Sequence, residues 1–347
     1  MTGVQTCALP IYVVLDTEDQ FEIDVSDFEP SMVQQEQTAD SGGQNAPLAG
    51  EMSGRSKAGK SALVQKYGGT AESEAAVAAG LRWLKSHQKP DGSWRFDHRC
   101  SNCDQTCTQH GSIKSSIGAT AMALLAYMGA GNSYIDGDHQ ETVKAALDFI
   151  LKNGKDTPYG LDLRGNAGGN SGMYTHGIAS ICLAEAYALN EMAMKRTNKK
   201  EINIGKTSRR QVLKDTKLLR AATAEAIRFI ASAQSKTRGG WRYDPTKDDS
   251  DTSVVGWQVM ALKSAKASGI SVPTVTLKGI DVYLDSVTKD GSEYGYTNPT
   301  PKHSTSAIRL LCRIQLGWTK TRSEEHTSEL HSRRYPVCRP LLEKQKP

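Results

Sequence analysis

The chain lacks a strong net charge of either sign. Its 347 residues include 43 Lys and Arg and 38 Asp and Glu, which gives a formal net charge of +5. Proteins that bind nucleic acid carry a concentrated positive charge, and an excess this small does not supply one. The basic stretch at residues 195–217 is typical of a solvated loop inserted into a repeat. We therefore expect no nucleic-acid partner.

Basic residues are absent altogether from residues 12–53, where all ten charged side chains are Asp or Glu. Like charges repel and keep such a segment extended and solvated. We interpret residues 12–66 as an acidic disordered linker and place the globular domain at residues 67–321. The string GRSKAGKS at residues 54–61 matches a phosphate-binding P-loop, but that motif works only between a buried strand and a helix. Because an acidic linker precedes it, we expect no nucleotide site.

The two ends of the chain are related to each other at the level of DNA. Residues 1–11 and 322–330 can be encoded by opposite strands of one DNA segment, and they resemble a translated sequencing adapter. We therefore expect residues 1–11 and 322–347 to be artefacts and the natural chain to be cut short at both ends. The lack of a signal peptide or membrane helix then carries no information.

Helical periodicity dominates residues 67–321, where a unit of two helices recurs four times. The first helix of each unit is amphipathic and ends in a turn of Gly and aromatic residues, whereas the second is rich in small and apolar residues. The first helices are visible from residues 81, 147, 227 and 280, and the second from residues 116, 176, 252 and 304. We predict an all-α fold, an incomplete α/α toroid of about four hairpins with the buried helices inside.

A motif of the form Gln-x-x-Asp-Gly-x-Trp marks the turns. It is matched by Gln88, Asp91, Gly92 and Trp94 in the first unit, Gln234, Gly240 and Trp241 in the third, and Asp290, Gly291 and Tyr294 in the fourth. With the string MYTHGIASICLAEAY at residues 173–187, this motif makes the chain similar to bacterial prenyltransferase and squalene oxidase repeat proteins. These belong to the terpenoid cyclase and protein prenyltransferase superfamily. The resemblance implies an α/α toroid, an apolar or isoprenoid-like ligand and further hairpins beyond residue 321. It also implies a membrane anchor before the acidic linker and an extracytoplasmic location, while the sequence itself leaves the compartment open.

Cyclases of this superfamily protonate their substrate with an Asp-x-Asp-Asp-Thr motif, and residues 248–252 read Asp-Asp-Ser-Asp-Thr. Aligned on the final Asp251, the proton donor is replaced by Ser250, whose hydroxyl is far too weak an acid. The alternative role for Asp251 is to cap the following helix. The zinc ligands of the prenyltransferases are also missing. Whether the chain is an enzyme stays open, with Asp251 and His176 as the candidate acids.

When residues 1–11 and 322–347 are excluded, five cysteines remain, and three of them lie within eight residues of each other. The pattern Cys-x-x-Cys-x-x-x-Cys-x-x-His is formed by Cys100, Cys103, Cys107 and His110. Four soft ligands so close predict a structural zinc site, and a disulfide with one spare thiol or free thiols are the alternatives. Cys182 and Cys312 lie on predicted apolar helix faces, so we expect them to be core thiols.

The junctions between turns and buried helices would gather at one rim of a toroid. The candidate ligand-binding residues, at this rim and on the buried helices, are Tyr174, Glu185, Trp241, Arg242, Tyr243 and Trp257. Glu185 lies within a buried helix, where a carboxylate needs a partner such as His176 or Arg242. Our leading hypothesis is a protein that binds a ligand or partner in its cavity or at its rim. The alternatives are an enzyme acting on an isoprenoid and a structural envelope module.

Overall fold

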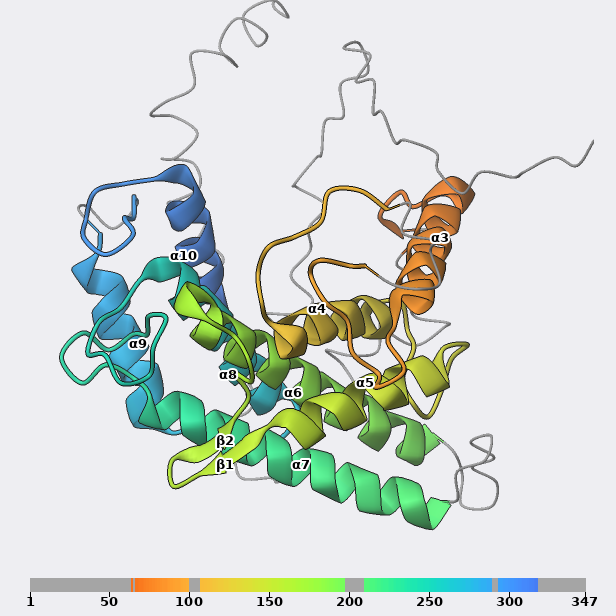
Figure 1. Cartoon of the computed structure of the whole chain (residues 1–347). Coiled ribbons are helices and arrows are strands. Elements are labelled where there is room, and N and C mark those ends of the chain that lie inside the picture. Colours follow the sequence, from red (N-terminus) through yellow and green to blue (C-terminus); the bar gives the residue numbers. More distant parts are fainter. Residues whose placement is uncertain (1–63, 65, 100–106, 197–208, 289–292, 318–347) are drawn as a thin grey trace, which may run out of the picture.

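The computed structural model describes residues 64, 66–99, 107–196, 209–288 and 293–317 (Figure 1). These residues form eight α-helices, one short 3-10 helix and a two-stranded sheet, so the chain is mostly helical, as predicted. None of the described helices is long and apolar enough to cross a membrane. Several predictions lie outside the described residues: the linker up to residue 63 with its P-loop string, both predicted artefact segments, Cys100, Cys103, Asp290 and Gly291.

The two helices of every unit are present. The first helices are α3 (Ala71–His87), α5 (Gln140–Asn153), α7 (Arg209–Ser232) and α9 (Thr274–Ser286). The second helices are α4 (Ser116–Gly129), α6 (Gly172–Arg196), α8 (Thr252–Ala267) and α10 (His303–Gln315). In the second unit, strands β1 (Lys155–Thr157) and β2 (Gly160–Asp162) pair antiparallel, and the 3-10 helix η5 (Gly169–Ser171) leads into α6. The predicted alternation of helices is confirmed within these residues.

Several helices begin where the sequence supplies a capping side chain. Thr70 caps α3, Ser115 caps α4 and Asp251 caps α8, each by accepting a hydrogen bond from the backbone N–H three residues further on. Such a cap satisfies one of the amide groups that the first turn of a helix leaves without a partner.

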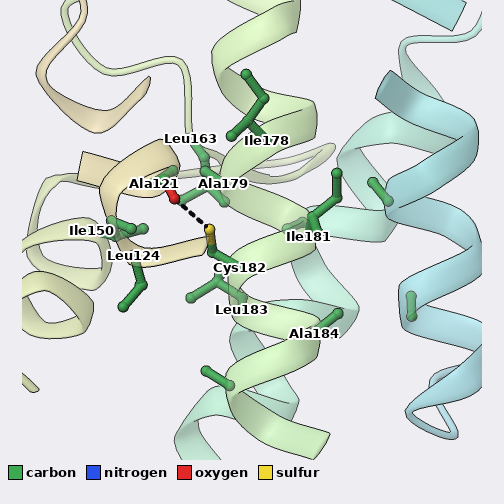
Figure 2. Close-up of a cluster of buried hydrophobic side chains, with 14 of the residues drawn as sticks. Ala121, Leu124, Ile150, Leu163, Ile178, Ala179, Ile181, Cys182, Leu183 and Ala184 are labelled. Atoms are coloured by element: carbon green, nitrogen blue, oxygen red, sulfur yellow. Dashed lines mark hydrogen bonds between the residues drawn. The ribbon is translucent and has the colours of Figure 1, made fainter. Parts of the chain in front are cut away.

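The second helices form a row in which α4 packs on α6, α6 on α8, and α8 on α10 (Figure 1). Helix α6 lies deepest, because every residue from 175 to 190 is buried. Small side chains let the helices approach closely: the thiol of Cys182 in α6 donates to the carbonyl of Ala121 in α4 at 3.0 Å (Figure 2). Cys182 and Cys312 are both buried, which confirms that they are core thiols.

The turns after the first helices join each unit to the next. The side-chain amide of Gln88 donates to the carbonyl of Gly92 in its own turn and to that of Thr142 in α5, at 3.1 and 2.9 Å. Gln234 repeats both contacts, to its own turn and to α9, at 2.7 and 2.9 Å. The glutamines of the motif therefore connect the turn after one first helix to the next first helix.

The glycine of the motif lies where two backbones touch. Gly92 and Gly239 have φ angles of +87° and +77°, in the left-handed region that favours glycine. A Cβ atom would lie 2.2 Å from the Ala145 carbonyl oxygen at Gly92, and 2.1 Å from that of Gly279 at Gly239. The motif glycine of the third unit is therefore Gly239, and its assignment to Gly240 from the sequence is corrected.

Candidate functional site

The starts of helices α6 and α8 lie together, and aromatic and polar side chains gather there. The amide of Met173 donates to the Tyr243 carbonyl, and the side chain of Gln258 in α8 donates to the Met173 carbonyl, at 3.2 and 2.8 Å. These contacts bring the third turn against the first turn of α6. Three of the predicted ligand-binding residues, Tyr174, Arg242 and Tyr243, meet at this point with the candidate acid Asp251.

A chain of hydroxyl groups links α6 to α8. The hydroxyl of Ser253 donates to Oδ1 of Asp251 at 2.7 Å, so it receives its own hydrogen bond from the phenol of Tyr174, 2.5 Å away. Tyr296 joins from the fourth unit, with its phenol 2.5 Å from that of Tyr243. Burial raises the pKa of Tyr174 and of Tyr296, so both phenols stay protonated near neutral pH.

Asp251 is fully buried and caps helix α8. Its Oδ1 atom accepts from the amide of Val254 at 2.9 Å, which confirms the capping role. Its Oδ2 atom has no hydrogen bond and lies 3.8 Å from Nε of Arg242. The guanidinium of Arg242 also pairs with Asp249 and lies 5.1 Å from the centre of the Tyr243 ring. The hydrogen bond to Asp249 raises the pKa of Arg242, so this arginine is a permanent cation beside Asp251.

Ser250, which the sequence pattern places at the position of a cyclase proton donor, is structural. It is fully buried, and its hydroxyl accepts the backbone N–H of Gly240 at 3.2 Å. This hydrogen bond connects the third turn to the start of α8, and the side chain of Ser250 does not reach solvent.

His176 lies apart from the cluster around Tyr174 and Asp251. It is fully buried, its Nδ1 accepts from the amide of Leu163 at 3.1 Å, and its Nε2 therefore carries the proton and donates to the Ala226 carbonyl at 3.1 Å. Its ring packs on Phe229 with centroids 4.6 Å apart. Burial lowers the pKa of His176 to about 4, so the imidazole is neutral. These contacts argue against the predicted role of His176 as an acid.

Two other predicted ligand residues, Trp241 and Glu185, also lie apart from this cluster. Trp241 is 1% exposed, and its indole N–H donates to the Ile230 carbonyl at 2.8 Å, so it anchors the turn. Glu185 lies nine residues beyond His176 in α6, about 13 Å along the helix axis. Both ring nitrogens of His176 are already hydrogen-bonded, so the predicted pair between Glu185 and His176 does not form. Trp257 is half-buried one helical turn after Ser253, on the same face of α8.

A cleft of about 510 Å³ opens beside Tyr174. It is lined by Ser112, Ile113, Lys114, Gly168, Asn170, Ser171 and Tyr174. The starts of α4 and α6 hold its walls together, because the hydroxyls of Ser115 and Thr175 lie 2.6 Å apart. Sequence reasoning missed the lining segments 112–114 and 168–171, which belong to loops without a motif. It also missed Ser253 and Tyr296.

The predicted zinc cluster is described only in part. His110 is exposed, and its Nδ1 lies 2.7 Å from the Asp97 carbonyl. Cys107 is a free thiol in contact with His87, a residue outside the predicted pattern. Among the residues that the structure describes, no group of three or more His, Cys, Asp and Glu side chains is arranged to hold a metal ion.

Compared with protein-family models, with curated proteins and with solved structures, the chain gives no match. The interpretation of the site therefore rests on its own geometry.

Proposed function

We propose that this chain is an α/α-toroid protein of the terpenoid cyclase and prenyltransferase type that binds a small apolar or isoprenoid-like ligand at the rim. The observation that carries this proposal is the cleft beside Tyr174. Its volume of about 510 Å³ lies within the range typical of small-molecule sites, about 300–1,000 Å³.

The toroid is supported by the repeated contacts of the turns. In the first and third units, a glutamine and a left-handed glycine connect one first helix to the next. The second unit does the same with Gly160, whose backbone contacts α7 so closely that a Cβ atom would lie 2.3 Å from the Glu225 carbonyl oxygen. A fixed step between successive hairpins, repeated in one direction, bends two rows of helices into a double-walled ring.

The lining of the cleft suits an amphipathic ligand. Ile113 is 56% exposed and, with the ring of Tyr174, offers an apolar surface. Lys114, Asn170 and the hydroxyls of Ser112 and Ser171 line the same cleft and can hydrogen-bond a polar end group. A molecule with a hydrocarbon body and a hydroxyl or anionic end, such as an isoprenoid alcohol or its diphosphate, matches this combination.

Isothermal titration calorimetry with farnesol and farnesyl diphosphate tests the proposal. We expect the full chain to bind at least one of them, and Ile113→Asp to weaken binding by tenfold or more, because burying an apolar side chain contributes about 1.5–3 kcal/mol. The matched control is Val275→Asp, since Val275 lies on α9 and is 75% exposed. Equal affinities of the wild type and Ile113→Asp, or no binding of either probe, would contradict the proposal.

The second candidate function is catalysis by Asp251, favoured by its buried Oδ2 atom, which accepts no hydrogen bond. Incubation of the chain with squalene or farnesyl diphosphate, followed by mass spectrometry, separates the two candidates. A product that disappears in Asp251→Asn would establish an enzyme. Binding without a product in either protein would leave the ligand-binding function alone.

A further inference from the structure

The first half of α7 presents basic side chains to solvent. The sequence predicts a loop for residues 195–217, but the structure places residues 209–217 in α7, which runs along one edge of the molecule (Figure 1). Arg210, Lys214 and Lys217 are all exposed. None of these three forms a salt bridge with a residue that the structure describes. Their positive charges are therefore available to a partner.

The three cations lie on one side of the helix. A helix turns by about 100° per residue, so Arg210, Lys214 and Lys217 lie within about 60° of one another around its axis. They are named the basic band below. The opposite side of α7, which includes the buried Val212 and Leu219, packs on α6 and β2. The basic band therefore points away from the core.

Two exposed leucines border the basic band. Leu213 is 36% exposed and Leu218 is 54% exposed, and each lies about 40° outside the band, on opposite sides of it. A charged face that meets only water has no need of leucines at its borders. Cations beside exposed apolar side chains on one helix are typical of a surface that lies on a membrane.

The acidic residues of α7 do not cancel the charge of the band. Glu225 pairs with Arg228, with 2.5 Å between its Oε2 atom and the guanidinium. Asp215 is half-buried, and its Oδ1 atom accepts a hydrogen bond from the side chain of Gln211 at 2.7 Å. Both carboxylates thus have partners of their own, and the basic band keeps its positive charge.

An exposed aromatic side chain lies beside the other end of α7. The guanidinium of Arg228 donates to the Pro158 carbonyl at 2.7 Å, and the hydroxyl of Ser232 donates to the Tyr159 carbonyl at 3.4 Å. These bonds hold the turn between β1 and β2 against α7, where Tyr159 is 66% exposed. Arg228 lies five helical turns beyond Arg210, so the same side of α7 extends for about 27 Å. A tyrosine ring suits the border between lipid headgroups and hydrocarbon.

We propose that this side of α7, with its basic band, Leu213, Leu218 and Tyr159, docks on a membrane surface that contains anionic lipids. The cations meet the negative headgroups, and the leucines and the tyrosine reach the edge of the hydrocarbon. Each Lys or Arg near such a surface strengthens binding about fivefold, so the band contributes about a hundredfold. The leucines favour lipid over nucleic acid, whose phosphates offer charge without hydrocarbon.

This surface does not include the cleft beside Tyr174, so either proposal can fail without the other.

Sedimentation with lipid vesicles tests the docking surface. The full chain is expected to sediment with vesicles of phosphatidylcholine and phosphatidylserine but not with phosphatidylcholine alone. It should be released at about 1 M salt, where the Debye length is about 3 Å. The double variant Lys214→Glu/Lys217→Glu should bind at least a hundredfold more weakly. Its matched control is Arg82→Glu/Lys85→Glu, an exposed pair on α3 with the same spacing and the same change of charge, which should bind like the wild type.

The apolar part of the surface has its own variant. Leu218→Ser should weaken binding about fivefold, because about half of a leucine side chain is available for burial. Val282→Ser on α9, where Val282 is 59% exposed, is the control that should change nothing. If circular dichroism shows that Lys214→Glu/Lys217→Glu is less helical than the wild type, Lys214→Gln/Lys217→Gln replaces it, with an expected loss of about thirtyfold.

Four outcomes would overturn the proposal. They are equal losses in Lys214→Glu/Lys217→Glu and Arg82→Glu/Lys85→Glu, equal sedimentation with neutral and anionic vesicles, unchanged binding in Leu218→Ser, and a wild-type chain that sediments with neither kind of vesicle. If that chain instead binds duplex DNA, and Lys214→Glu/Lys217→Glu does not, the partner of the basic band is a nucleic acid.

Discussion

Two glycines with nearly the same backbone conformation offer a direct measurement of how tightly the third turn packs on α9. Gly239 has a φ angle of +77°, and Gly269, just after α8, has a φ angle of +75°. A Cβ atom at Gly239 would lie 2.1 Å from the Gly279 carbonyl oxygen in α9, whereas at Gly269 it would meet nothing within 4 Å. The two Ala substitutions therefore share the cost of the left-handed conformation and differ in the contact with α9.

The magnitudes follow from these two terms. The left-handed conformation costs an alanine about 1–2 kcal/mol relative to glycine, and this is the whole effect expected for Gly269→Ala. Gly239→Ala adds an overpacked contact with backbone, which costs about 1–3 kcal/mol more, because α9 must shift. The free energy of unfolding should thus fall by about 1–2 kcal/mol in Gly269→Ala and by roughly 2–5 kcal/mol in Gly239→Ala.

Urea unfolding followed by circular dichroism measures the difference as a shift of the transition midpoint at constant slope. Gly240→Ala serves as a second comparison, because the three atoms nearest to a Cβ atom at Gly240 belong to the side chains of Val255 and Ser250, at 2.8–2.9 Å. Equal losses of stability in Gly239→Ala and Gly269→Ala would refute the close approach of the third turn to α9, and with it the assignment of Gly239 as the motif glycine.

Two further predictions concern the buried polar groups. The pKa of His176 is about 4 in the folded chain and 6.5 when exposed, so the unfolded chain binds more protons between these values. Stability should then rise by roughly 3 kcal/mol from pH 4 to 6.5 and gain nothing from this group at higher pH. Urea titrations at several pH values check this prediction. It would be refuted if the free energy of unfolding rose as steeply with pH in His176→Gln as in the wild type. At the start of α8, Asp251→Ala should cost about 1–2 kcal/mol and Asp251→Asn less, because asparagine caps as well as aspartate. Thermal unfolding of both variants measures this difference. Equal losses of stability in Asp251→Ala and Asp251→Asn would exclude the capping role.

The order of the helices could be predicted because it depends on local patterns. Apolar residues at helical spacing mark the first helices, and runs of small apolar residues mark the buried second helices. Both kinds of helix can therefore be recognised before any tertiary contact is known. The capping role of Asp251 is local in the same sense. So is the burial of Cys182, whose neighbours in α6 are nearly all small or apolar.

The errors arose where a role depends on what covers a residue. His176 and Tyr174 stand two residues apart at the start of α6, and sequence treats them alike. Only the tertiary structure shows that the end of β2 and helix α7 close over His176, while Tyr174 borders the cleft. The contact between His87 and Cys107 was missed for the same reason, since twenty residues separate them and the obvious histidine of the pattern lies three residues from Cys107.

The capping of α8 and the shape of the cleft are coupled, and this affects how variants of Asp251 must be interpreted. Oδ1 of Asp251 accepts hydrogen bonds from the amide of Val254 and from the hydroxyl of Ser253. Because the Ser253 hydroxyl uses its only proton in this bond, it can only accept from the phenol of Tyr174. The requirements of a helix cap thereby orient the phenol of Tyr174, which forms part of the wall of the cleft. In Asp251→Asn the side-chain oxygen can still accept from Val254, but the new amide group replaces Oδ2 beside the guanidinium of Arg242, where a donor faces a donor. The variant should therefore keep the cap of α8 and alter the surroundings of Arg242. A change in ligand affinity without a loss of product would then show that Asp251 positions the site. Loss of product at unchanged affinity would show catalysis.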